Sequence, residues 1–188
     1  MPESELPEHL IHERNLLRVE IAEVFAGVTR EGGVSWGETG SSYPNRDTTW
    51  TDLVNDPDWN VRPEDGGFSF LDPIGRRYYL PAAMMRDLLE PEGWLISFQL
   101  TVNSSIPGLA ESCPEMDWRS YFLEQWSALS DSEKATVKRF VEFKRSVKQT
   151  QLDEMVRDAP EEIAWQIRES YVAHCPWHIA YSSYWENL

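Results

Sequence analysis

The chain has 188 residues, and its 17 lysines and arginines stand against 32 aspartates and glutamates, for a formal net charge of −15. A hydrophobic fraction of 41% and a charged fraction of 26% are typical of a folded globular protein rather than a disordered one. No apolar run approaches the ~18–20 residues of a membrane span. The acidic N-terminus lacks the apolar core of a signal peptide. We therefore expect a single cytoplasmic domain over residues 1–188, with residues 1–7 as a frayed N-terminal segment.

The excess of negative charge restricts the partners that the surface can bind. It repels phosphate backbones and anionic lipids, so we expect no membrane partner and no general binding of nucleic acid. It is compatible with a basic protein partner, although such charge more often serves solubility. The two cysteines, Cys113 and Cys175, are too few for a disulfide framework and are expected to stay reduced.

The first predicted element is a helix from Glu8 to about Val28. Its apolar residues recur at spacings of three, four and seven, which places them on one face, and Gly32 and Gly33 follow it. Residues 32–67 are rich in glycine, serine, proline, asparagine and aspartate, with a short helical turn at 50–54. We expect a long irregular region there, of a kind that is often functional.

The strongest β signal spans residues 68–80, where two aromatic segments flank Asp72-Pro73-Ile74-Gly75-Arg76. Aspartate, proline and glycine at these positions predict a hairpin turn. Pro81 suits the first turn of a helix over 81–89, and 94–102 is typical of a third strand.

The remainder of the chain is predicted to be helical. After a loose connection at 103–117, helices are expected over 118–129, 135–147 and 160–173, and Ser130 with Glu133 forms a capping-box pattern. The predicted fold class is therefore α+β. A small antiparallel sheet, the 68–80 hairpin plus the 94–102 strand, is covered by the N-terminal helix and several C-terminal helices.

A family resemblance lies in the run from Phe68 to Met84, FSFLDPIGRRYYLPAAM. It resembles the motif of an uncharacterised bacterial family, the domain of unknown function DUF6714: an aromatic strand, a Pro–acid–Gly turn and Arg-Tyr-Tyr-Leu-Pro-Ala. Ile74 stands where the family often has an acid. The resemblance extends to Asp58-Trp59 before this run and to Tyr184-Trp185 near the C-terminus. It implies a compact bacterial α+β domain and transfers no activity and no catalytic residue.

Candidate binding residues come from the irregular region and the predicted turn. Trp36, Tyr43, Trp50 and Trp59 lie in or beside its loops, and exposed aromatic side chains there would make a binding surface. The turn also supplies two candidate binding residues, Arg76 and Arg77. Alternation along a strand would send these two to opposite faces, so at most one would line a given pocket.

The segment most similar to a metal site holds His174, Cys175 and His178. Histidines four residues apart share a helix face, but Pro176 argues against a regular helix between them. We favour a packed aromatic tail over a metal site and expect no metal and no cofactor. No nucleophile elbow is present, so we predict no catalytic residues.

A basic stripe is predicted along one third of the surface of the 135–147 helix and its flanks. A solvated helix face is the favoured interpretation, and a docking face for an acidic partner or a nucleic acid is the alternative. The stripe consists of Lys134, Lys138, Lys144, Arg145 and Lys148.

The leading functional hypothesis is a non-enzymatic, acidic protein-binding module, immunity-like or regulatory, that binds a basic protein. The alternative is a small-molecule-binding protein or an enzyme that uses the 32–67 loops and the 72–77 turn. A third hypothesis is a homo-oligomer assembled through the aromatic tail.

Overall fold

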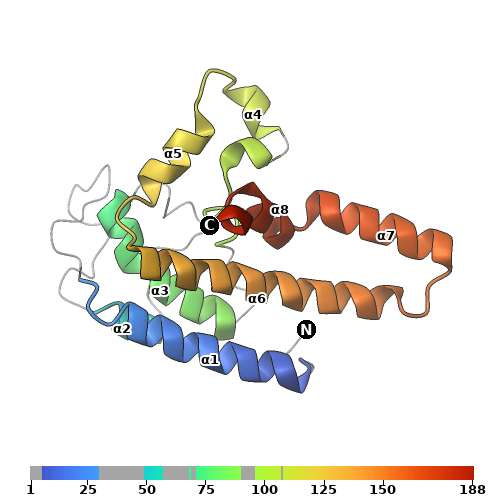
Figure 1. Cartoon of the computed structure of the whole chain (residues 1–188), viewed down its shortest axis with the longest axis horizontal. Helices are drawn as coiled ribbons and strands as arrows, with labels where there is room; N and C mark the ends of the chain where they lie inside the picture. Colours follow the sequence, from blue (N-terminus) through green and yellow to red (C-terminus); the bar gives the residue numbers. More distant parts are fainter. Residues whose placement is uncertain (1–5, 30–48, 57–67, 69–70, 90–95, 107) are drawn as a thin grey trace.

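The computed structural model describes residues 6–29, 49–56, 68, 71–89, 96–106 and 108–188. These residues form α-helices and no β-sheet. Figure 1 shows the longest helix, α6, crossing the molecule, with α1 beside its first half and α7 beside its second half. The helices are α1 (Glu8–Val24), α2 (Trp50–Leu53), α3 (Pro73–Leu89), α4 (Leu109–Ser112), α5 (Trp118–Gln125), α6 (Asp131–Val156), α7 (Glu161–His174) and α8 (Pro176–Ser183), with 3-10 turns η3 (Asn103–Ser105) and η4 (Trp185–Asn187).

The predicted α+β class is wrong for the described residues, and the hairpin at 68–80 is replaced by the start of α3. The Asp72 Oδ1 atom accepts a hydrogen bond from the Gly75 backbone N–H at 2.7 Å, and the Arg76 N–H donates to the Asp72 carbonyl at 2.9 Å. Aspartate followed by proline thus marks a helix N-terminus, because the carboxylate caps the first turn and proline loses no hydrogen bond there. Pro81, expected to begin a helix, lies inside α3.

The third predicted strand, at 94–102, is also wrong for its described part. The Leu100 N–H donates to the carbonyls of Ile96 and Ser97, each at 3.1 Å, so the backbone bonds within its own segment. All residues from 96 to 102, polar and apolar, are buried except Phe98, which is 47% exposed. Polar and apolar residues alternate along this segment, but they do not alternate between solvent and core as they would in a half-buried strand.

The helices predicted for the C-terminal half are confirmed as α5, α6 and α7, and α6 is longer than expected. The capping box is confirmed as well. The Ser130 N–H donates to Glu133 Oε2 at 2.7 Å, and the Glu133 N–H donates to Ser130 Oγ at 3.3 Å. The predicted first helix is confirmed, but it ends at Val24 rather than near Val28.

The main core collects apolar residues from α1, α2, α3, α5, α6, α8 and η4. Aromatic residues near the C-terminus lie inside it. Trp185 is fully buried and its indole N–H donates to the Leu100 carbonyl at 2.8 Å. Trp177 meets Phe140 edge to face, with ring centroids 5.5 Å apart. Two aromatic residues of the tail therefore serve this chain's own core.

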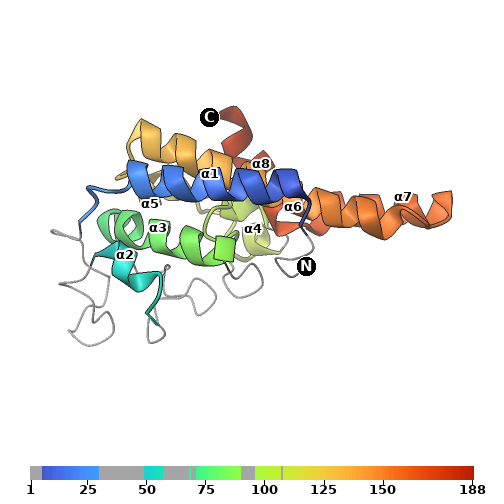
Figure 2. The ribbon, with the colours of Figure 1, turned by 90° about the horizontal axis from the view of Figure 1, so that it is seen from below.

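The distal part of α6 and the whole of α7 form a helical hairpin that projects beyond the other helices (Figure 2). We call residues 149–174 the arm. It has a small apolar cluster of its own, separate from the main core, made of Leu152, Val156 and Ala164 with Ile167 and Tyr171 packed against them. No helix in the described part of the chain is long and apolar enough to cross a membrane.

Candidate functional site

The aromatic surface predicted for the irregular region is not assembled by the described residues. Trp36, Tyr43 and Trp59 lie outside them. Trp50 is only 2% exposed, and its indole N–H donates to the Phe25 carbonyl at 2.9 Å. The expected exposure of Trp50 is therefore wrong, because this side chain joins α2 to the end of α1.

The two arginines of the predicted turn have different environments at the start of α3. Arg76 is 3% exposed and lines a small polar cavity. Arg77 forms a fork-like ion pair with Glu133, with its Nη2 2.8 Å from Oε1 and its Nε 3.0 Å from Oε2. Successive residues of a helix are about 100° apart, so the two side chains do not take the opposite faces expected of a strand. Because Glu133 also caps α6, Arg77 links the starts of two helices.

The histidine–cysteine segment forms the corner between α7 and α8. Helix α7 ends at His174, Cys175 lies at the junction, and Pro176 begins α8, as the predicted helix break requires. Cys175 is buried and its backbone N–H donates to the Tyr171 carbonyl at 2.8 Å. Within the described parts of the chain, no three histidine, cysteine or acidic side chains are grouped to hold a metal ion.

Lys144 does not belong to a solvated basic face, contrary to that expectation. It is buried, and its Nζ lies 2.5 Å from Asp87 Oδ2 and 5.3 Å from the centroid of the Trp177 ring. Burial lowers the pKa of Lys144, and the Asp87 charge opposes that shift. The side chain connects α6 to α3 inside the core.

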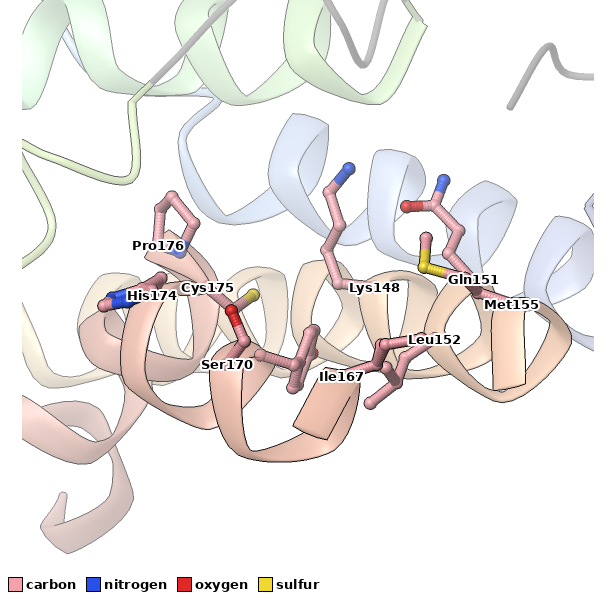
Figure 3. A pocket seen from close by; sticks show the side chains of 10 residues that line it. Lys148, Gln151, Leu152, Met155, Ile167, Ser170, His174, Cys175 and Pro176 are labelled. Carbon is pink, nitrogen blue, oxygen red and sulfur yellow. The ribbon is translucent and has the colours of Figure 1, made fainter. Parts of the chain in front are cut away.

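An apolar groove of about 400 Å³ lies between the two helices of the arm (Figure 3). One wall comes from α6 and the other from α7, and the α7–α8 junction closes one end. The groove is lined, among others, by Lys148, Leu152, Met155, Ile167, Ser170 and His174.

Large apolar side chains are exposed on the arm itself. The exposed fractions are 66% for Met155, 58% for Trp165, 54% for Val172 and 45% for Ile163. Ile163 lies one turn before Ile167 on α7 and so extends that wall of the groove. Trp165 and Val172 are seven residues apart and share another face of α7. The arm thus offers two apolar surfaces to a partner.

The charge of the arm is negative. Its 26 residues contain six acidic and two basic side chains, which gives a net charge of −4. The acids are Asp153, Glu154, Asp158, Glu161, Glu162 and Glu169, and the bases are Arg157 and Arg168. The exposed apolar residues therefore share the arm with six acidic side chains.

Our sequence reasoning did not identify the arm as a site, although a signal was present. Ala164, Ile167 and Tyr171 form the stripe that packs on α6. Trp165 and Val172 lie off this stripe, so the helix has more apolar residues than one buried face can use. An excess of this kind indicates an interaction surface.

In the part of the chain that the structure describes, the fold is all-helical and carries an acidic projecting hairpin. The chain belongs to a family of unknown function, DUF6714, whose sequence profile matches residues 13–164. The match begins within α1 and ends in the first turn of α7, so it includes the motif between Phe68 and Met84 and confirms the resemblance. No curated protein and no solved structure matches the chain.

Proposed function

We propose that the protein is a non-enzymatic binding module that uses its arm to bind a basic protein. The observation that supports this proposal is the exposure of Met155, Ile163, Trp165 and Val172 on a segment with a net charge of −4. Tryptophan and methionine are enriched in protein interfaces, and buried tryptophans are frequent hot spots. The acidic side chains of the same segment steer a basic partner and disfavour an acidic one.

The size of the apolar surface gives a useful driving force. Trp165 is 58% exposed. Covering its exposed surface with a partner would contribute on the order of 3 kcal/mol to the free energy of binding. The groove adds a recess into which an apolar side chain of the partner fits. Met155 on its α6 wall suits such a contact, because methionine adapts its shape easily.

The first experiment compares captured proteins between matched variants of the full chain. Tagged wild-type protein, Met155→Ala/Trp165→Ala and Leu16→Ala are each incubated with lysate of the source cells at low and high salt. Leu16 on α1 is 51% exposed and serves as the control for loss of an exposed apolar side chain. We expect wild type and Leu16→Ala to retain one stoichiometric basic protein at low salt, and the double variant to lose it.

A charge-matched pair tests the electrostatic part of the proposal. Glu161→Lys/Glu162→Lys and Glu111→Lys/Glu115→Lys change the net charge equally, on the arm and away from it, and all four side chains are exposed. We expect about a tenfold or larger loss of affinity only for the first pair. Equal losses would mean that overall charge, not the arm, determines binding.

Light scattering identifies another occupant of the arm. A wild-type dimer that becomes monomeric in Met155→Ala/Trp165→Ala, while Leu16→Ala stays dimeric, would show that a second copy of this chain covers the arm. That result, or equal capture by wild type and the double variant, would overturn the proposal.

A further inference from the structure

A cavity with different chemistry lies where α3, α5 and the turn before η3 meet. Its volume is about 40 Å³, which is room for a small polyatomic anion or for one or two waters. The polar side chains that line it are Arg76, Gln99, Asn103, Tyr121 and Gln125, and Trp126 supplies an aromatic wall. Phe98, also part of its lining, is 47% exposed.

Arg76 is held in this cavity by contacts that leave part of its guanidinium free. Its Nε donates to the Leu71 carbonyl at 3.3 Å and its Nη1 to Gln99 Oε1 at 3.2 Å. The guanidinium carbon lies 5.4 Å from the centroid of the Trp126 ring. Within the described residues, Nη2 has no hydrogen-bond partner and no carboxylate pairs with Arg76.

A buried cation without a counterion is costly, and the chain avoids this arrangement at neighbouring cations. Arg77 pairs with Glu133, and buried Lys144 pairs with Asp87. Burial lowers the pKa of Arg76 to about 10, still well above neutral pH, so the side chain keeps its charge. In a protein with a net charge of −15, the lack of a carboxylate partner at Arg76 within the described residues leaves room for an external anion.

We propose that the Arg76 cavity binds a small oxyanion group, either the carboxylate or the phosphate of a small molecule. The free guanidinium N–H groups donate to its oxygens, as arginine does to planar and tetrahedral oxyanions. The Gln99, Asn103 and Gln125 amides and the Tyr121 hydroxyl supply further hydrogen-bonding groups around it. Exposed Phe98 lies where it can contact an apolar remainder of the same molecule.

Titration of the full chain with acetate and with inorganic phosphate, against chloride at equal ionic strength, tests this proposal. The signal is the Trp126 indole N–H resonance, because that N–H donates to the Gln99 carbonyl at 3.2 Å beside the cavity. We expect a saturable shift with a Kd on the order of 1–10 mM for an isolated group. Saturation by acetate alone identifies a carboxylate ligand, and saturation by phosphate alone identifies a phosphorylated one.

Matched variants decide whether Arg76 is the binding group. We expect Arg76→Lys to weaken the anion affinity by about tenfold or more, because lysine lacks the planar fork. Arg77→Lys, the neighbouring arginine outside the cavity lining, is expected to bind as wild type. Gln125→Ala leaves the hydrogen bonds of Arg76 to the Leu71 carbonyl and to Gln99 in place, so a folded variant remains if Arg76→Lys unfolds. We expect this variant to lose about threefold in anion affinity.

Three outcomes would overturn the inference. They are a shift that fails to saturate below about 50 mM, an equal effect of chloride, and unchanged binding in Arg76→Lys and Gln125→Ala. Met155→Ala/Trp165→Ala is expected to bind the anion as wild type does. Failure of the arm proposal and failure of the anion site are therefore distinguishable.

Discussion

Buried charged residues have a strong local influence in this protein, and the Lys144–Asp87 pair shows it. Both side chains are almost fully buried, with exposed fractions of 4% and 1%. Their contact connects α6 and α3, and the Trp177 ring lies against the ammonium. Removing one partner leaves the other charge inside the core, which is far more costly than losing a surface ion pair.

We expect Lys144→Met to lower the free energy of unfolding by about 3–5 kcal/mol, because it removes the ammonium that faces the buried Asp87 carboxylate. The double variant Lys144→Met/Asp87→Leu is expected to recover part of that loss, since both charges are then gone. Urea unfolding followed by circular dichroism measures these changes. Lys148→Met, a partly exposed lysine on the same helix, is the control. An equal loss in Lys148→Met would contradict the structural role of Lys144.

His178 gives the protein a pH-sensitive position at the α7–α8 corner. Burial lowers its pKa from the usual 6.5, nearby Arg145 lowers it further, and Glu186 acts in the opposite direction. The centroid of the His178 ring also lies 6.2 Å from the centroid of the Tyr171 ring. In the folded state the histidine therefore takes up a proton only at a lower pH than in the unfolded chain.

The unfolded chain binds more protons at pH values between the folded pKa of His178 and about 6.5, so stability falls as the pH is lowered through this window. We expect the urea midpoint of His178→Gln to fall less than that of the wild type between pH 7 and pH 5.5. His174→Gln, whose native side chain is exposed, should retain the wild-type dependence. An NMR titration of His178 with a pKa at or above 6.5 would refute this.

At the scale of elements, α3 shows why the predicted sheet was wrong. Its sequence has aromatic residues, proline and glycine, which favour strands and turns. Yet α3 is buried around most of its circumference, and a short, largely apolar segment next to turn-forming residues is compatible with either a buried helix or a strand. An Asp-Pro pair is compatible with both a turn and a helix start, and tertiary packing determines which one forms.

Asp72 offers a direct test of its capping role. We expect Asp72→Ala to lower the free energy of unfolding by about 0.5–2 kcal/mol, because the Gly75 N–H loses its side-chain acceptor. Asp72→Asn retains an acceptor and should cost less. Circular dichroism with chemical denaturation measures both. Equal destabilisation by the two substitutions would mean that Asp72 acts through its charge rather than as a cap.

The C-terminal helices were predictable because their signals are local. Ser130 and Glu133 form a capping box, and exposed helix faces carry polar residues. The burial of Trp50 and of Lys144 depends on partners far away in the chain, Phe25 and Asp87. Propensity and periodicity do not contain that information, and so the sequence placed both residues at the surface.

The whole molecule divides into a large core and a small arm cluster, and their stabilities should differ. The arm cluster has three buried residues, whereas the main core draws on seven elements. Local opening costs least where few apolar contacts must be broken. The arm is therefore expected to open without unfolding α1 or α3.

Hydrogen exchange measured by mass spectrometry tests this difference. We expect amides of α7 to exchange faster than those of α1, although both helices are long and regular. Leu152→Ala should speed exchange in α7 further and leave α1 unchanged, because Leu152 belongs only to the arm cluster. Val137→Ala, in the main core, is the matched change and should affect α1 instead. Equal protection of α1 and α7 would show that the two clusters form one cooperative unit.

The burial of Trp185 against the Leu100 carbonyl also bears on how the protein is made. Residues of α1 such as Leu10 share a core with this tryptophan, which the ribosome adds 175 residues later. At about 5–20 residues per second, the N-terminal helices wait roughly 10–35 s for their last partner. During every round of translation their apolar faces are uncovered, and holdase chaperones have that interval in which to bind them.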